Sequence, residues 1–106
     1  LRDRFSFQSR DPDANGDPLG PFAPRFTVSA RTIYLRGSEP VMQQRLQGQQ
    51  PIVLTIRKEP RTRQITNAWR AVDVLTGYAY NVTSVSPGDR GFLDILATRL
   101  VDGDAG

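Results

Sequence analysis

The chain has 106 residues, enough for one hydrophobic core but too few for two, and its composition, 38% hydrophobic and 24% charged, is that of a globular protein. It contains no cysteine and no histidine, which excludes disulfides and removes the commonest metal ligand and general base. No apolar run approaches membrane-spanning length, and the opening residues do not resemble a signal peptide. We therefore expect a protein made in the cytoplasm that uses no metal or other cofactor, is not an enzyme and has no membrane partner.

Positive charge is concentrated in the first two thirds of the chain. The net charge is +3, but residues 1–70 carry 12 basic and 6 acidic side chains, whereas residues 71–106 carry 2 basic and 5 acidic ones. Thirteen of the 14 basic residues are arginine, whose planar guanidinium suits bidentate contact with phosphate or carboxylate groups. A GC-rich genome explains the same arginine bias without any partner, so the charge alone speaks only weakly for nucleic acid.

The first predicted strand covers residues 4–9, where Phe5 and Phe7 alternate with polar side chains. Residues 11–24 follow, with four prolines, three aspartates and two glycines. This density of strand and helix breakers predicts a long flexible loop, and long loops in compact domains are usually functional or disordered. We expect Phe22 to tether part of the loop to the domain.

The aspartates of this loop, Asp11, Asp13 and Asp17, resemble a cation-binding loop only superficially. The glycine and the terminal glutamate of a calcium-binding hand are absent, so no metal site is predicted.

The second predicted strand covers residues 26–36. Its apolar residues switch from one face to the other, so we expect a bulge or bend near Arg31 or Thr32, as a small closed barrel needs at its corners. The third predicted strand, residues 51–58, carries apolar side chains on one face.

One short helix is predicted between these two strands. Ser38 is a suitable N-cap, and Gly48 occupies the position of a C-cap glycine. Met42 and Leu46 are four residues apart, so we expect both to press on the barrel.

Four basic side chains lie close together where the third strand ends, at Arg57, Lys58, Arg61 and Arg63. Clustered basic residues displace condensed counterions from a phosphate backbone, so this run is a candidate contact with DNA. A solvated loop would show the same pattern.

The rest of the chain predicts a β-meander with strands at residues 69–75, 78–86 and 92–101. Gly77 and Gly88 mark its two turns, since glycine adopts positive φ without steric cost.

Together the elements predict an all-β fold, a small antiparallel β-barrel of about six strands with one short helix and a long loop after the first strand. We expect a single β-barrel domain over residues 1–101, which includes the flexible loop of residues 11–24, and a disordered tail at residues 102–106.

Five segments together resemble a known family. They are the opening Leu-Arg-Asp-Arg-Phe-Ser-Phe-Gln, Arg-Gly-Ser-Glu at residues 36–39, the strand at 52–57, Trp-Arg-Ala-Val at 69–72 and Tyr-Asn-Val-Thr-Ser-Val at 80–85. In their order and spacing, over nearly the full chain, they resemble the head-closure, head-tail joining or stopper proteins of tailed bacteriophages.

The resemblance implies a structural subunit of a tailed phage or phage-like particle. Such subunits form a ring, commonly a dodecamer, at the head-tail connector of the virion. The portal or adaptor protein lies above the ring, the tail or a tail-terminator protein below it, and double-stranded DNA passes through the channel. The ring helps retain packaged DNA and docks the tail.

The resemblance also implies two candidate sites. The long loop matches the family's loop after the first strand in position, and its candidate channel or gating residues are Asp11, Asp13, Asn15, Gly16, Asp17 and Phe22. The run of Arg57, Lys58, Arg61 and Arg63 is a candidate contact with DNA or with a neighbouring subunit.

The alternative is a monomeric small-barrel module that binds nucleic acid or peptides through exposed aromatic and arginine side chains. Core packing explains Trp69, Tyr78 and Tyr80 equally well, because strand aromatics are more often buried.

Overall fold

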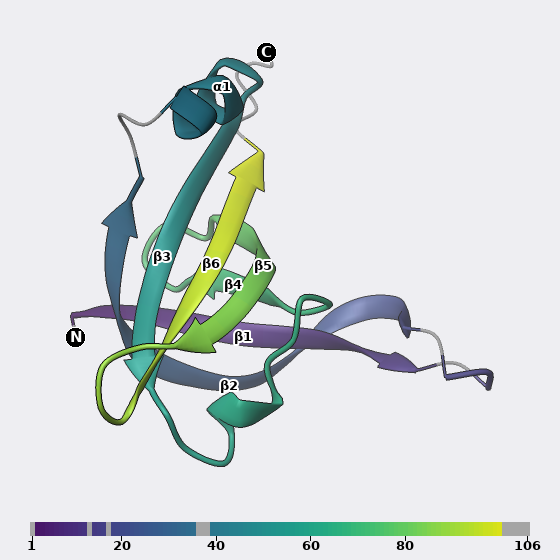
Figure 1. Cartoon of the computed structure of the whole chain (residues 1–106). Coiled ribbons are helices and arrows are strands. Elements are labelled where there is room, and N and C mark those ends of the chain that lie inside the picture. Colours follow the sequence, from purple (N-terminus) through teal and green to yellow (C-terminus); the bar gives the residue numbers. More distant parts are fainter. Residues whose placement is uncertain (1, 13, 17, 36–38, 101–106) are drawn as a thin grey trace.

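The chain folds into a closed antiparallel barrel with one short α-helix, and a computed structural model describes residues 2–12, 14–16, 18–35 and 39–100 (Figure 1). Within these residues the elements are β1 (Asp3–Pro12), β2 (Pro18–Tyr34), α1 (Glu39–Leu46), β3 (Gln49–Arg57), the 3-10 helix η1 (Thr62–Gln64), β4 (Arg70–Asp73), β5 (Ala79–Pro87) and β6 (Phe92–Leu100). The strand order around the barrel is β1-β2-β3-β6-β5-β4, and β4 pairs with β1 to close it. The predicted fold class is confirmed.

The long strand β2 forms a corner of the barrel. It pairs with β1 as far as Asp3↔Ala30 and with β3 from Ala30↔Ile56 onward. Ala30 is fully buried at the change of partner, where a small side chain allows the two neighbouring strands to approach.

Alternating side chains from all six strands fill the barrel. The buried apolar residues are Phe5, Phe7, Ala30, Ile52, Leu54, Ile56, Ile65, Ala71, Tyr80, Val82, Leu93, Ile95 and Ala97. An aromatic row extends this core at one edge, since the ring centroid of Phe26 lies 5.8 Å from that of Phe7 and 5.7 Å from that of Trp69. The core placement of Trp69 and Tyr80 is confirmed, whereas Tyr78 is 48% exposed.

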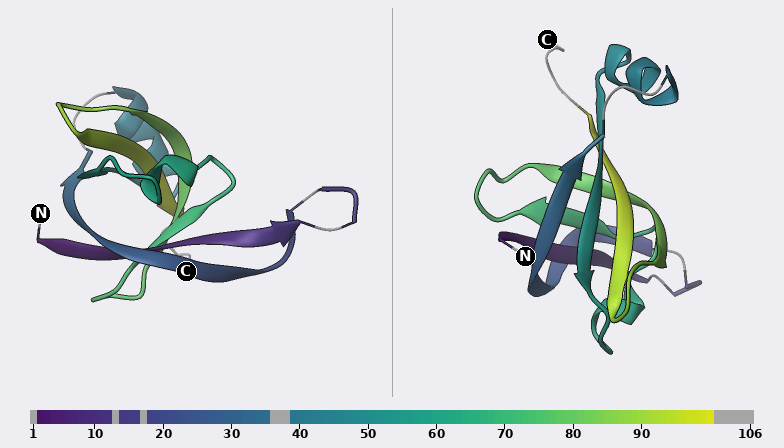
Figure 2. Two further views of the ribbon diagram at one scale, coloured as in Figure 1. Left: turned by 90° about the horizontal axis from the view of Figure 1, so that it is seen from below. Right: turned by 60° about the vertical axis from the view of Figure 1, so that its left-hand side comes forward.

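The prediction of a long loop at residues 11–24 is wrong. β1 continues to Pro12 and β2 begins at Pro18, with Arg10 opposite Phe22 and Pro12 opposite Pro18. The two strands form a hairpin arm, residues 8–12 and 18–25, that extends sideways from the barrel (Figures 1 and 2). The prolines fit because each strand of a two-stranded ribbon has one open edge where no N–H is needed.

The sequence predicted a bulge or bend near Arg31 or Thr32. No bulge is present there, because β2 and β3 pair in continuous register from Ala30 to Tyr34, but β2 does form a corner of the barrel close by, at Ala30. The register shifts instead between Phe7 and Gln8 of β1, which leaves Arg25 as the extra residue on β2. The apparent change of faces has a simpler cause, because Ile33 lies on the outer face and is 44% exposed.

The predicted short helix is present, but its packing differs from the expectation. Gly48 has a φ of 78° and its N–H donates to the Arg45 carbonyl, as expected for a C-cap glycine, while Ser38 lies outside the described residues. Met42 and Leu46 are 44% and 83% exposed, so they do not press on the barrel. α1 contacts β3 at one end of the barrel (Figure 1).

The meander is confirmed as β4, β5 and β6. Gly77 has the expected positive φ, 80°, but in the second turn it is Gly91, with a φ of 74°, and not Gly88 that adopts this conformation. The tail, residues 102–106, lies outside the described residues.

Candidate functional site

The hairpin arm contains the first set of predicted site residues. Asn15 and Gly16 lie exposed in the turn at its tip, where Gly16 has a φ of 87°. Asp11 lies in β1 and Phe22 in β2, so neither belongs to a loop. Asp13 and Asp17 lie outside the described residues.

Phe22 anchors one face of the arm between two arginines. The Cζ atoms of Arg10 and Arg70 lie 5.6 and 4.4 Å from the Phe22 ring centroid, within the range of cation–π contacts. The Nε atoms are also engaged, since Arg10 donates to the Gly20 carbonyl at 2.8 Å and Arg70 to Gln8 Oε1 at 2.9 Å. Because Arg70 belongs to β4, the expected tether between Phe22 and the domain is present.

Arg25, the bulged residue, holds the other face of the arm. Its Nη2 lies 2.7 Å from Asp11 Oδ1, and its Nε donates to the Ser9 hydroxyl at 2.8 Å. The pair is solvent-exposed, so we assign it a small contribution to stability. Together the two faces hold the arm as a shaped element rather than a free loop.

The second set of predicted residues lies where β3 leaves the barrel, at the end opposite α1, far from the tip of the arm (Figure 1). Arg61 Nε lies 2.6 Å from Glu59 Oε1, and the Arg61 guanidinium lies 5.4 Å from the Phe26 ring. Arg57 lies over the Phe92 ring at 5.7 Å. The four basic residues therefore differ in their environments.

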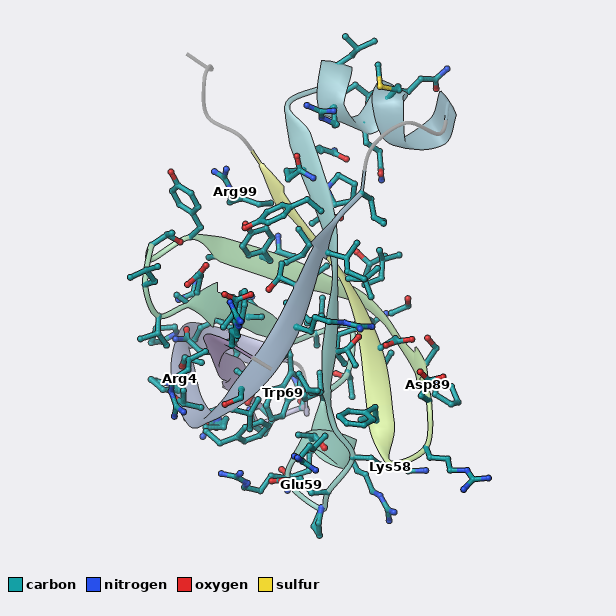
Figure 3. All side chains as sticks on the ribbon, turned by 90° about the vertical axis from the view of Figure 1, so that its left-hand side faces the viewer. Arg4, Lys58, Glu59, Trp69, Asp89 and Arg99 are labelled. Atoms are coloured by element: carbon teal, nitrogen blue, oxygen red, sulfur yellow. The ribbon has the colours of Figure 1, made fainter. Side chains whose placement is uncertain are left out.

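Lys58 and Arg63 are the two basic residues of this run whose side chains have no partner among the described residues. Both are exposed, and Figure 3 shows Lys58 and Glu59 at this end of the molecule, with Arg99 near the opposite end. Of the four candidates, these two are therefore the most available to an outside partner.

Thr62 shapes this basic segment, and sequence reasoning missed it. The side chain is fully buried, and its hydroxyl accepts a hydrogen bond from the Glu59 N–H at 2.9 Å. The same hydroxyl lies 2.8 Å from the Arg57 carbonyl oxygen and 3.0 Å from that of Glu59 and donates to them. A threonine between arginines carries no periodic signal in the sequence, so only the contacts identify it.

A cluster of tyrosines around Arg99 lies near the α1 end of the barrel (Figure 3). The Arg99 Cζ lies 3.9 Å from the Tyr78 ring centroid and 5.9 Å from that of Tyr80. Burial raises the pKa of Tyr80 and the neighbouring Tyr34 adds to the rise, whereas Arg99 opposes it. The cluster fixes the end of β6 against β5.

Two kinds of feature are absent from the part of the chain that the structure describes. No three acidic side chains there come together to hold a metal ion. No helix there is long and apolar enough to cross a membrane.

Comparison with known proteins places this geometry in context. The chain is similar to a chain in the virion of a native gene transfer agent particle, with a TM-score of 0.66 and 18% identity over 95% of this chain and 97% of that one. It is also similar to a protein of Shigella flexneri 2a known from a solution structure, with a TM-score of 0.64 and 22% identity over 93% and 92% of the two chains. At these low sequence identities, the two TM-scores show that the fold is shared and nothing more. Among curated protein sequences, none matches the chain.

The family comparison covers almost the whole chain. Residues 1–100 match the phage head completion protein family, a structural family without enzymatic activity. This confirms the resemblance found in the sequence, and the chain belongs to the phage head completion protein family.

Proposed function

We propose that copies of this chain form a ring, most simply a dodecamer, at the head-tail connector of a phage-like particle. The chain is a structural virion component of such a particle, as its family membership indicates. In the proposed ring it lies below the portal or adaptor protein, helps retain packaged DNA and docks the tail or a tail-terminator protein.

The ring proposal rests on two surface features that lie on opposite sides of the barrel. The hairpin arm and the turn between β4 and β5 extend from opposite sides of the barrel (Figures 1 and 2). A closed ring joins two different surfaces of the same protein, so a projecting element on one side and a receiving surface on the other meet its requirement.

The turn between β4 and β5 has the composition of a receiving surface. Leu75 is 92% exposed, Val74 56% and Tyr78 48%. Clustered exposed apolar side chains are typical of protein interaction sites. In the proposed ring, the arm of one copy covers this turn of the next copy.

The free cations Lys58 and Arg63 have two roles that fit a connector. They contact DNA in the channel, or they pair with an acidic surface of a neighbouring subunit. The double substitution Lys58→Gln and Arg63→Gln separates the two, because loss of DNA retention with intact rings favours the first and loss of rings favours the second. Unchanged retention and unchanged rings would exclude both roles.

Electron microscopy of particles made without this gene tests the connector role. We expect heads that package DNA but lack tails or lose their genome, with normal particles restored when the gene is supplied in trans. Intact, tailed and DNA-filled particles would contradict the proposal.

A gating role for the arm is a separate part of the proposal. In the sequence Asp13 and Asp17 flank Asn15 and Gly16, the residues of the tip, and the proposal is that their negative charge repels DNA from the channel. Shortening residues 11–24 to a tight turn is expected to reduce DNA retention. Normal retention and tail attachment with the shortened arm would exclude this role.

A further inference from the structure

The strand β2 has an open edge that the barrel leaves uncovered. Between Pro18 and Ser29 it pairs on one side with β1, while pairing with β3 on the other side begins only at Ala30↔Ile56. The same register places Arg57, the last residue of β3, opposite Ser29, so the second side has no described strand beside it over residues 18–28. Unpaired strand edges present rows of N–H and C=O groups that another chain can pair with.

The register shows which backbone groups face this opening. The Val74 N–H donates to the Arg4 carbonyl at 3.0 Å, so the polar backbone groups of Arg4, and by alternation those of Ser6, point toward β4. Ser29 and Thr27 lie opposite these two residues. Their N–H and C=O groups therefore point away from β1, those of Ser29 toward Arg57 at the end of β3 and those of Thr27 into the opening.

A proline ends the usable edge on the side of the arm. Pro24 lies opposite Gln8, which pairs with β4, so Pro24 faces the same opening but has no N–H to offer. The edge available for strand pairing thus runs from Arg25 to Val28, and β3 begins to cover it at Ser29.

A groove of about 250 Å³ runs along this edge. Its lining residues are Arg4, Thr27, Val28, Ser29, Arg57, Glu59 and Arg61. Glu59 is paired with Arg61, whereas no carboxylate among the described residues pairs with Arg4 or Arg57. The groove therefore combines open backbone groups with two unneutralised guanidinium groups.

We propose that this groove binds an extended, acidic segment of another protein of the particle, which adds a strand to β2. The backbone of the segment pairs with Thr27, next to the point where β3 takes over at Ser29, and its carboxylates accept hydrogen bonds from Arg4 and Arg57. Such strand addition takes affinity from main-chain hydrogen bonds and specificity from side-chain contacts. The proposal requires only that the chain is a virion component, not that it forms a ring.

Two other occupants fit the groove less well. Phosphate oxygens only accept hydrogen bonds, so DNA would satisfy the arginines but leave the open C=O group of Thr27 without a donor. The other open edges among the described strands are β5 beyond Asn81, which carries no acidic side chain, and residues 9–12 of β1, where Asp11 is already paired with Arg25. A second copy therefore offers no strand with a free carboxylate.

Photocross-linking in assembled particles identifies the occupant directly. Thr27 is exposed, so a benzoylphenylalanine at position 27 reaches the groove without disturbing the core. We expect mass spectrometry to find a cross-link to an acidic stretch of a different virion protein. Cross-links only to a second copy, only to DNA, or to nothing would overturn the proposal. Amide NMR spectra of the substituted protein verify its fold.

A synthetic peptide tests the chemistry of the groove. The probe is a hexapeptide of alternating glutamate and valine, and its control replaces each glutamate by lysine. We expect the acidic peptide to shift the amide signals of Thr27 and Ser29, and Arg4→Gln and Arg57→Gln each to weaken its binding about twofold to fivefold. Arg63→Gln removes the same charge outside the groove and is expected to leave binding unchanged.

The peptide experiment also has clear contrary outcomes. No shift at either amide, equal binding of the lysine peptide, or equal loss with Arg63→Gln would refute the groove. None of these readouts involves DNA retention or tail attachment, so failure here leaves the ring proposal to be judged by microscopy.

Discussion

Thr62 offers the most direct test of how the basic segment is held. Substitution by valine keeps the shape of the side chain but removes the hydroxyl. The Glu59 N–H then loses its acceptor and the Arg57 carbonyl its donor, both beside a fully buried side chain. Each buried polar group left without a partner costs about 1–3 kcal/mol. We expect the free energy of unfolding to fall by about 2–4 kcal/mol.

Urea unfolding measures this loss, and serine is the matched control. Thr62→Ser keeps the hydroxyl and removes one methyl group, so it should cost only about 1 kcal/mol. For a domain of this size, the valine variant should lower the urea midpoint by about 1–2 M with an unchanged slope. A valine variant as stable as the serine variant would show that the hydroxyl does not hold the segment and would refute the reasoning.

Three further changes test other parts of the structure. Phe22→Leu should weaken the arm by about 1 kcal/mol through loss of its two cation–π contacts, seen as faster amide exchange in β1 and β2, and unchanged exchange would exclude the contacts. Gly77→Ala should cost about 1–2 kcal/mol in thermal unfolding, because the added Cβ meets open space but φ is 80°, and a neutral effect would contradict this assignment. Tyr80 has a raised pKa in the folded state, so it stabilises the protein below the ordinary tyrosine pKa and loses this contribution as the pH rises through its folded value. Tyr80→Phe should therefore flatten the alkaline decline of stability, and an identical decline would remove Tyr80 as its cause.

Periodicity predicted the barrel well because its strands obey simple rules. β3 alternates Ile52, Leu54 and Ile56 toward the core, and the meander has turn residues at its boundaries. Strands that bury one face must show this pattern, whatever their partners. The order of strands around the barrel was not predictable, because it depends on pairings between distant segments.

The arm shows where composition misleads. Prolines and glycines at residues 11–24 predicted a loop. These residue types end a strand only where it must form backbone hydrogen bonds with a neighbouring strand on each side. Beyond Gln8, which also pairs with β4, each strand of the arm has a single partner, and Pro24 faces the open side of β2. The information that decides between loop and ribbon is thus tertiary. The same holds for Met42 and Leu46, whose spacing fits a buried face that does not exist here.

The candidate site was predicted in outline and not in its contacts. The basic run is visible in the sequence, but the sequence could not distinguish Arg61, which is paired with Glu59, from Arg63, which has no side-chain partner among the described residues. It also could not reveal the open edge at Thr27, since a β-branched residue has the same pattern in an edge strand and a central one. An edge strand and a central strand differ only in whether a second strand lies beside them, which the sequence of the strand does not show.

The short exposed helix α1 indicates that this end of the protein can adapt in the particle. α1 has eight residues, and isolated helices shorter than about 12 residues are marginal in water. α1 contacts β3, but Met42 and Leu46 remain exposed and contribute little to the stability of the helix. A helix held this weakly reorients at a small cost in free energy. We therefore expect the α1 end, and not the closed barrel, to change when the protein joins the particle.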